Sequence, residues 1–182
     1  MLYLHSCHVI HRDLKPDNVL LSSKIRARIT DFGMSKTRAS AAASLYVGAG
    51  GTMVYTAPEV QSIGIGKGKR SIDVYSFAIT ANELYAEQRP FGGTDPSDVP
   101  KLVLAGERPL LAEQALGPGL AAIITAGWSQ VSSDRPTFHS VKMNHMLVQH
   151  GQPVSLRYVC FCRASHRACP RVLGDHGGFM PR

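Results

Sequence analysis

The sequence predicts a mainly α domain with one short β-hairpin near its N-terminus. Residues 72–87 carry apolar side chains at the three- and four-residue spacing of a helix. Residues 19–29 form two short apolar runs on either side of a polar turn, a pattern typical of a hairpin. After residue 149 the apolar periodicity is lost. We therefore expect a domain over residues 1–149 and a disordered basic tail over residues 150–182.

The N-terminal part of the chain contains the predicted strands. Residues 1–9 are expected to be the end of an apolar helix. Val19–Leu21 and Ile25–Ile29 are predicted to be strands joined by the turn Ser22-Ser23-Lys24. From Ser35 to Gly51 the chain is rich in Ala, Ser and Gly without a sustained period, which predicts a mobile loop.

The rest of the domain is predicted to be helical. The longest helix is expected at Ile72–Glu87, after a Gly-rich loop at Ile63–Lys69. Its apolar face consists of Val74, Phe77, Ala78, Ala81, Leu84 and Tyr85. Three more helices are expected at Pro96–Ala105, Glu113–Trp128 and Pro136–Gln149, and the last begins with a proline suited to a first helical turn.

Composition and cysteine usage narrow the class of protein. The 182 residues are 44% hydrophobic and 18% charged, as in ordinary globular domains. No stretch approaches the roughly 18 consecutive apolar residues of a membrane span, and the N-terminus lacks the layout of a secretory signal. Three of the four cysteines crowd into residues 160–169. That spacing does not form a framework of paired bridges, so we expect free thiols and a cytoplasmic location.

The net charge of +7 raises the question of nucleic-acid binding. The tail over residues 151–182 holds five arginines and one aspartate, so it carries much of this excess. Neither the tail nor the domain has a run of lysines and arginines or an ordered basic stripe. The charge pattern therefore argues against a nucleic-acid partner.

Two motifs flank the predicted hairpin and a third follows the loop. The first is His11-Arg12-Asp13-Leu14-Lys15-Pro16-Asp17-Asn18, the second Asp31-Phe32-Gly33 and the third Ala57-Pro58-Glu59. In residue, spacing and order they resemble the eukaryotic protein kinases. Residues 73–79 and 134–138 look most like the tyrosine-kinase-like branch of serine/threonine kinases. The resemblance covers residues 1–149 and implies the fold of the larger, C-terminal kinase lobe, with the hairpin beside the catalytic loop.

The resemblance implies roles for four residues. Phosphoryl transfer depends mainly on positioning and charge compensation. Asp13 would accept the proton of the substrate hydroxyl as catalytic base, and Lys15 would stabilise charge near the transferred phosphate. Asn18 and Asp31 would hold Mg²⁺, which prefers oxygen ligands. The implied cofactors are ATP and Mg²⁺, and the implied substrate is a protein.

Five other residues are expected to support this site structurally. His11 and Phe32 would hold the catalytic loop and the metal-binding motif in register. Glu59 and Arg135 would form a buried ion pair, which is costly to break from one side. Asp73, at the start of the long helix, would brace the catalytic loop.

The segment after the metal-binding motif carries the expectations about substrate and regulation. Thr52 lies where the activation segment of serine/threonine kinases ends, and there it would order the catalytic residues. Together with Lys15, it favours serine/threonine over tyrosine specificity. Ser40 or Ser44 is expected to be phosphorylated and read by Arg12, because a phosphate forms charge-assisted hydrogen bonds with a guanidinium. The alternative is that both hydroxyls are merely solvated.

Family members also have a smaller lobe that covers ATP with a Gly-rich loop, a strand lysine and a helix glutamate. Neither G-x-G-x-x-G nor V-A-I-K occurs in this sequence, and only ten residues precede His11. We interpret this as a truncated kinase domain with little activity alone. Its exposed apolar face would need the small lobe or a partner to cover it. The alternative is a non-catalytic module that binds partners through the large lobe.

Two further patterns carry weaker signals. Gly64–Lys69 resembles a phosphate-binding loop, but Gln61 replaces its first glycine and no apolar strand precedes it. Residues 160–169 contain three cysteines and a histidine, but not at the spacing of the common zinc modules. We expect an exposed loop in the first case and no metal site in the second.

Overall fold

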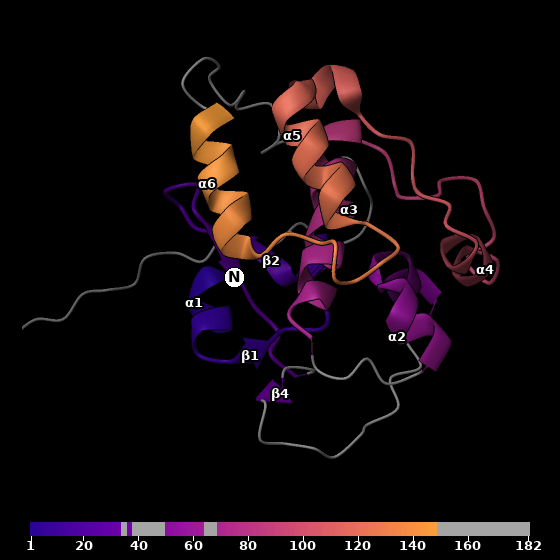
Figure 1. Cartoon of the computed structure of the whole chain (residues 1–182), viewed down its shortest axis with the longest axis horizontal. Helices are drawn as coiled ribbons and strands as arrows, with labels where there is room; N and C mark the ends of the chain where they lie inside the picture. The colour runs from indigo at the N-terminus through magenta and orange to yellow at the C-terminus, as the bar shows by residue number, and fades with distance from the viewer. Residues whose placement is uncertain (34–35, 38–49, 64–68, 149–182) are drawn as a thin grey trace, which may run out of the picture.

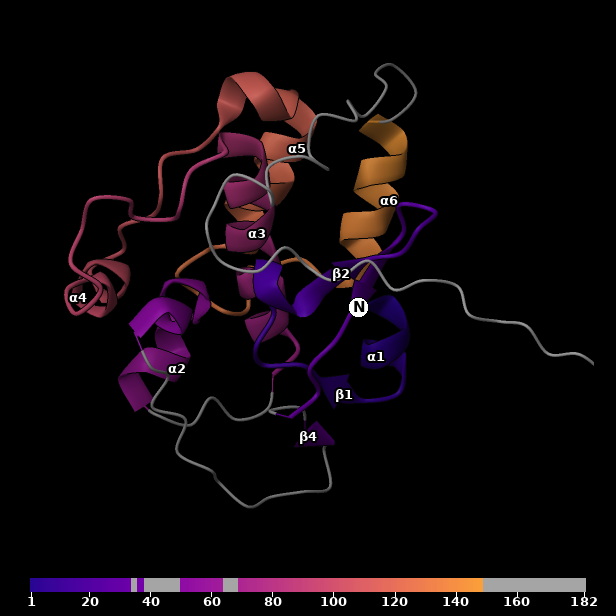
Figure 2. The same cartoon turned by 180° about the vertical axis from the view of Figure 1, so that it is seen from behind.

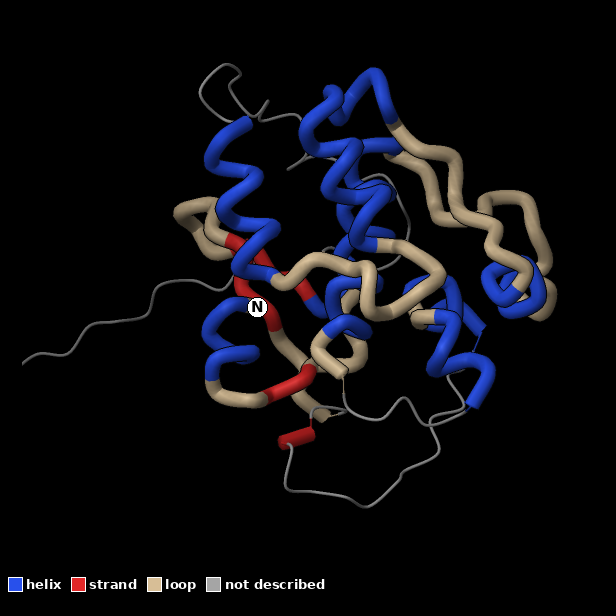
Figure 3. Tube along the Cα trace, in the orientation of Figure 1, coloured by secondary structure: helices blue, strands red, loops and turns tan. Residues whose placement is uncertain are grey.

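The computed structural model describes residues 1–33, 36–37, 50–63 and 69–148, and this part is mainly α, as predicted (Figure 1). Figure 3 shows the strands gathered close to the N-terminus, and the remainder as helices joined by loops. The helices are α1 (Leu2–Ser6), α2 (Pro58–Ile63), α3 (Ser71–Ala86), α4 (Val99–Leu104), α5 (Glu113–Gly127) and α6 (Phe138–Val148), with 3-10 turns η1 (Pro16–Asn18) and η2 (Gly50–Tyr55). The strands are β1 (Val9–Ile10), β2 (Val19–Leu21), β3 (Ala27–Ile29) and β4 (Lys36–Thr37).

Strands β2 and β3 form the predicted antiparallel hairpin, in which Leu20 lies opposite Arg28. The second strand begins at Ala27 instead of Ile25. Ile25 has a left-handed backbone with φ of 56°, and its N–H donates to the Ser22 carbonyl at 2.8 Å. The connection is therefore longer than the predicted three-residue turn.

The N-terminal helix is shorter than expected. Helix α1 ends at Ser6, and His8 has a φ of 58° that turns the chain into strand β1. Strand β1 pairs antiparallel with β4. The expectation of a loop from Ser35 onward is therefore wrong for Lys36–Thr37, and residues 38–49 lie outside the described part. A two-residue strand whose partner is distant in the chain leaves no local periodicity in the sequence.

Helix α3 is the central helix of the domain, and α5 packs along it (Figure 2). The helix ends where Glu87 adopts a left-handed φ of 53°. Val74, Ala78 and Ala81 of the predicted apolar face are buried, whereas Leu84 is exposed. The polar residues that this helix also buries are Asp73, Ser76, Thr80 and Asn82. A helix buried on nearly all sides needs partners for such groups, which the candidate site below supplies in part.

Helices α4 and α5 both depart from their predicted outlines. Helix α4 begins at Val99, later than expected, because the N–H of Asp98 donates to the Asp95 carbonyl at 2.9 Å in a preceding turn. Helix α5 is broken at Gly117, whose φ of 67° and ψ of 164° suit glycine. Pro118 then begins the second part, since a proline is well tolerated in a first helical turn.

Helix α6 begins two residues after the predicted Pro136 start. The Thr137 hydroxyl accepts a hydrogen bond from the Ser140 N–H at 3.2 Å, which caps the helix at Phe138. Helix α2 and both 3-10 turns were not expected, because six residues or fewer are too short to establish a helical period.

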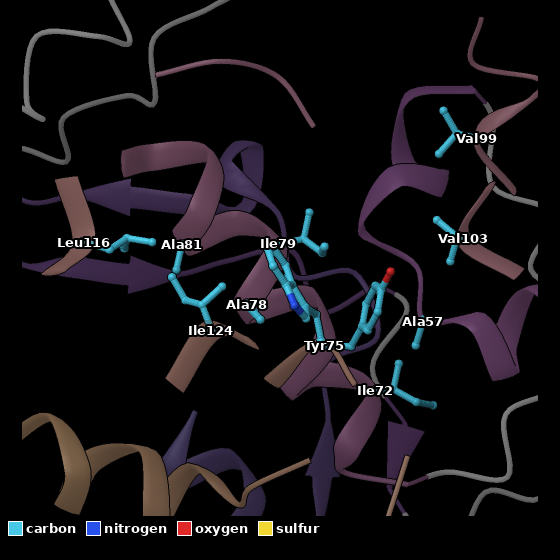
Figure 4. Close-up of a cluster of buried hydrophobic side chains, with 11 residues drawn as sticks. Ala57, Ile72, Tyr75, Ala78, Ile79, Ala81, Val99, Val103, Leu116 and Ile124 are labelled. Atoms are coloured by element: carbon cyan, nitrogen blue, oxygen red, sulfur yellow. The ribbon is translucent and has the colours of Figure 1, made fainter. Parts of the chain in front are cut away.

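The main core joins α3 to α2, α4 and α5. Figure 4 shows Ala81 and Ile124 facing each other between α3 and α5, and the Tyr75 ring directed toward Ala57. Tyr75 and Ile79 have no exposed surface. Burial of such side chains stabilises the domain by about 1.5–3 kcal/mol each. The core therefore fixes α3, which carries several residues of the candidate site.

We predict that Gly127→Ala destabilises the domain by about 1–3 kcal/mol through overpacking. A Cβ at position 127 would lie 2.9 Å from the Ala78 Cβ, where α5 crosses α3. Urea unfolding measures the loss. In an Ala78→Gly background the same substitution should cost almost nothing, and an equal cost in both backgrounds would contradict the contact.

Candidate active site

The loop between β1 and β2 brings together three of the predicted site residues. The Lys15 Nζ lies 2.9 Å from Oδ2 of Asp13. The Asn18 side-chain amide donates to the same Oδ2 at 2.9 Å and to the Asp13 carbonyl at 2.7 Å. A cation and an amide therefore hold one oxygen of a carboxylate group that is only 8% exposed.

The second carboxylate oxygen of Asp13, Oδ1, differs from Oδ2 in its hydrogen bonding. Within the described part of the chain, Oδ1 is buried and has no hydrogen-bond partner. A buried acceptor without a partner is costly, and such groups often mark a functional site. Oδ1 of Asp13 is thus the oxygen of this carboxylate group whose capacity to accept a hydrogen bond is unused among the described residues.

His11 connects this loop to the Asp31-Phe32-Gly33 turn. Its Nε2 donates to the Thr30 carbonyl at 2.9 Å, and its Nδ1 is 3.4 Å from the Asp13 N–H, which fixes the tautomer. The His11 and Phe32 rings pack edge to face with centroids 5.3 Å apart. Thr30 also donates its N–H to the Asn18 carbonyl at 2.9 Å. These contacts hold the hairpin exit against the catalytic loop.

Asp31 and Asn18, the two residues expected to hold Mg²⁺, both carry side-chain oxygen atoms. Asp31 is exposed and has a left-handed φ of 59°, and its Oδ1 accepts the Gly33 N–H at 3.1 Å. Asn18 uses its Nδ2 for both bonds to Asp13, so its amide oxygen takes no part in them. Carboxylate and amide oxygens are ligands that suit Mg²⁺. The described residues contain no group of three or more His, Cys, Asp or Glu at metal-binding distance.

Asp73 supports the catalytic loop from the start of α3. Its carboxylate group is fully buried and accepts the N–H of His11 at 2.9 Å and the N–H of Arg12 at 2.8 Å. Arg12 has a φ of 71°, an uncommon conformation for a residue other than glycine. The two bonds hold the N–H of this strained residue and the N–H of the residue before it, and Asp13 follows directly.

Glu59 and Arg135 form a bidentate ion pair that joins α2 to the segment before α6. The two N–O distances are 2.7 and 2.8 Å. Arg135 also donates to the Ser129 and Ser71 carbonyls. Its guanidinium group lies over the Tyr75 ring at 5.0 Å. Burial raises the pKa of Tyr75 to about 12, so its hydroxyl group stays protonated at neutral pH.

Sequence reasoning missed the contact between Tyr55 and Glu83. The Tyr55 hydroxyl donates to the Glu83 carboxylate at 2.7 Å, and Ser76 donates to the Tyr55 carbonyl at 2.8 Å. Burial raises the pKa of Glu83, and the Tyr55 hydrogen bond offsets this only in part. Burial and the Glu83 charge also raise the pKa of Tyr55. These bonds attach the end of η2 to α3, and no local pattern in the sequence could have revealed them.

For several predicted residues, the structure describes either the backbone alone or nothing. Thr52 lies in η2, but its side chain is among those not described. Ser40, Ser44, residues 64–68 and the cysteines of residues 160–169 also lie outside it. Lys69, at the end of the Gly-rich stretch, is exposed.

The motifs, the loop geometry and the helical scaffold together define a protein kinase large lobe. A family model described as protein tyrosine and serine/threonine kinase matches residues 1–145. The chain therefore belongs to the protein kinase family. In the described residues, no helix is long and apolar enough to cross a membrane.

Individual proteins similar to this chain are also named protein kinases. The RGS domain-containing serine/threonine-protein kinase A of Dictyostelium discoideum is 35% identical over 138 residues, which are 76% of this chain and 12% of that protein. Receptor-interacting serine/threonine-protein kinase 2 of Bos taurus is 35% identical over 151 residues, 75% of this chain and 28% of that protein. Serine/threonine/tyrosine-protein kinase HT1 of Arabidopsis thaliana is 39% identical over 142 residues, 78% of this chain and 35% of that protein.

The chain thus spans between 12% and 35% of the length of these curated relatives. The receptor-interacting kinase among them confirms the resemblance to the tyrosine-kinase-like branch. The predicted fold class, a kinase large lobe with a hairpin beside the catalytic loop, is confirmed as well.

We predict that Glu59→Ala lowers the free energy of unfolding by about 3 kcal/mol, because it leaves the buried Arg135 guanidinium unpaired. Urea denaturation measures the change. Asp98→Ala is the matched control, since it breaks the solvent-exposed pair with Lys101 and should change stability little. Equal effects of the two substitutions would contradict the importance of the buried pair.

We predict that Glu83→Gln raises the melting temperature at neutral pH. The pKa of Glu83 is raised in the folded protein, so the folded state binds more protons and stability falls as pH rises through this range. The difference from wild type should vanish near pH 4, where Glu83 is largely protonated even in the unfolded chain.

Thermal unfolding at both pH values tests this, with Glu107→Gln on the surface as the control. A Glu83→Gln protein that is less stable than wild type at neutral pH would show that the ionised carboxylate is favoured instead.

Proposed function

We propose that this chain carries the catalytic loop of a serine/threonine protein kinase, with Asp13 as the base that accepts the proton of the substrate hydroxyl. The observation that carries the proposal is that the two oxygens of the Asp13 carboxylate group have different surroundings. Oδ2 is held by Lys15 and Asn18, whereas Oδ1 is buried without a partner among the described residues. A substrate O–H that donates to Oδ1 would be oriented for attack and could pass its proton to Asp13.

The neighbouring residues would compensate charge. Lys15, whose side chain is 17% exposed, can reach a transferred phosphate while remaining close to Asp13. Asn18 and Asp31 would hold Mg²⁺ through their side-chain oxygens. Mg-ATP would supply the phosphoryl group and the metal charge that stabilises its transfer. The protein's contribution is thus mainly fixed position and charge.

The choice of serine/threonine over tyrosine rests on two supports. The sequence has Lys15 two positions after Asp13, and Thr52 at the end of the activation segment. Two relatives are named serine/threonine kinases, and a third is named a serine/threonine/tyrosine kinase. We propose that the kinase is cytoplasmic and that it phosphorylates a protein substrate on serine or threonine.

Full activity would also need a second lobe that covers ATP. Phe32, beside the proposed metal ligand Asp31, is 48% exposed although it is a large apolar side chain. A small lobe, from the same polypeptide or from a partner, would cover this ring and complete the nucleotide site. We propose that residues 1–149 act as the large lobe and that residues 150–182 form a separate tail.

We predict that Asp13→Asn lowers kcat by at least about 1,000-fold in a protein that joins this chain to the small lobe of a related kinase, because the amide cannot accept the proton. Incorporation of labelled phosphate from Mg-ATP into serine and threonine peptides measures the rate. Asp17→Asn is the matched control and should retain the rate.

Wild-type turnover with asparagine at position 13 would rule out the base assignment. If the joined protein folds and binds Mg-ATP but transfers no phosphate even with Asp13 intact, the non-catalytic interaction module becomes the better account.

A further inference from the structure

The hairpin of β2 and β3 carries exposed cations outside the kinase motifs. Lys24, Arg26 and Arg28 are all exposed, and the Ile25 side chain is 53% exposed. Figures 1 and 2 show that the turn between the two strands projects beyond α6, a helix that contains no Asp or Glu. Within the described part of the chain, no carboxylate group forms an ion pair with Arg26 or Arg28. Residues 24–29, the basic hairpin surface, therefore have unbalanced positive charge.

The strand aligns the two arginines of this surface. Successive side chains of a strand point to opposite faces and rise by about 3.3 Å each, so Arg26 and Arg28 lie on one face about 6.6 Å apart. Arg26 directly precedes β3, and its carbonyl accepts the Ser22 N–H at 3.0 Å, which continues the pairing of the hairpin. Ile25 and Ala27 separate the cations, so they form no run in the sequence.

The bonding pattern of the hairpin shows which backbone groups face outward. Beyond the Ser22–Arg26 bond at one end, the Thr30 N–H donates to the Asn18 carbonyl at 2.9 Å at the other end. In an antiparallel pair, hydrogen-bonded positions recur at every second residue. Arg28 lies midway between Arg26 and Thr30, so its N–H and C=O groups are directed toward β2.

Strand β3 therefore has an open edge. The N–H and C=O groups of Ala27 and Ile29 alternate with those of Arg28 and point away from β2. Within the described residues, β2 and β3 form a sheet of their own, and no third strand pairs with either. Such an edge is a template for an added strand, whose main chain supplies the missing hydrogen bonds.

The charge and the open edge together select the kind of partner. Main-chain donors and acceptors in alternation match another polypeptide in extended conformation. Carboxylates at every second position of that polypeptide would have the same spacing as Arg26 and Arg28. The tail of this chain does not fit, since residues 151–182 hold five arginines and one aspartate. Residues 32–58 contain no acidic residue at all.

We propose that the basic hairpin surface is a docking site for an acidic segment of a partner protein. The segment pairs with the open edge of β3 as an added strand and places carboxylates opposite Arg26 and Arg28. Ile25 offers an apolar contact beside these pairs. The inference goes beyond phosphoryl transfer and does not depend on the role of Asp13.

The test measures binding of two labelled peptides to the full chain by fluorescence anisotropy. In the first peptide glutamate and valine alternate, and in the second the same residues are arranged with the glutamates consecutive. The alternating peptide should bind at least about 10-fold more tightly, because only its carboxylates face both arginines from one side of a strand. Added salt should weaken its binding, since the pairs are close to solvent.

Variants of the chain separate the charge from the strand edge. The double variant Arg26→Gln and Arg28→Gln should weaken binding of the alternating peptide by about 10-fold or more. The matched control is Lys69→Gln with Arg89→Gln, since both cations are exposed and lie outside the hairpin. Ala27→Pro removes an outward N–H but no bond to β2, and it should also weaken binding. A peptide with methylated backbone nitrogens should lose affinity too, without any change to the protein.

Four results would overturn the proposal. Equal affinity for the two peptides would show attraction by charge alone, and so would full binding of the methylated peptide. Tighter binding of a single-stranded oligonucleotide or of phosphatidylserine vesicles through the same arginines would assign the surface to another partner. If the joined kinase no longer binds the peptide, the surface belongs to the contact between the lobes. Peptide binding needs no phosphoryl transfer, so the result stands even if the joined kinase is inactive.

Discussion

The buried carboxylate group of Asp73 is the interaction on which the candidate site depends. It lies at the start of the central helix α3 and binds two consecutive N–H groups of the catalytic loop, at 2.8 and 2.9 Å. A buried charge is tolerated only when its hydrogen bonds are made. The Asp73 carboxylate therefore fixes the loop backbone, and the N–H groups of the loop in turn stabilise the buried charge. The strained backbone at Arg12 is held in this way. The direction of the Asp13 side chain thus follows from a helix in the core.

The segment of η2 and α2, residues 50–63, is attached to the same helix by separate contacts. Tyr55 donates to Glu83, and Ser76 donates to the Tyr55 carbonyl. Glu59 pairs with Arg135, which packs over the ring of Tyr75. Helix α3 therefore connects the loop of residues 11–18 with η2 within one framework. Such a framework suits phosphoryl transfer, in which the protein contributes mainly fixed positions and charges.

Features that depend on residues close together in the chain could be predicted from the sequence. Contacts that form only when distant segments pack together could not. The resemblance of residues 11–18 to the catalytic loop of protein kinases predicted that Asp13, Lys15 and Asn18 act together, and the structure brings these three side chains into contact. The long helix followed from apolar periodicity, but Leu84 is exposed, since α3 is buried on nearly all sides and polar residues share its interior. Strands of two residues need a distant partner and have no period of their own. The contact between the His5 ring and the Asp73 carboxylate group, at 2.8 Å, likewise arises only in the folded chain.

In the proposed site, Asn18 and Asp31 would present oxygen ligands to a divalent ion. Paramagnetic broadening by Mn²⁺, in an isotope-labelled chain with ADP present, tests it most directly. We expect the amide signals of Asn18, Asp31 and Asp13 to broaden at the lowest Mn²⁺ concentration. In Asp31→Ala, these three signals should no longer broaden before the others. Broadening that begins instead at the exposed acidic turn of residues 95–98, or that is unaffected by Asp31→Ala, would contradict the account.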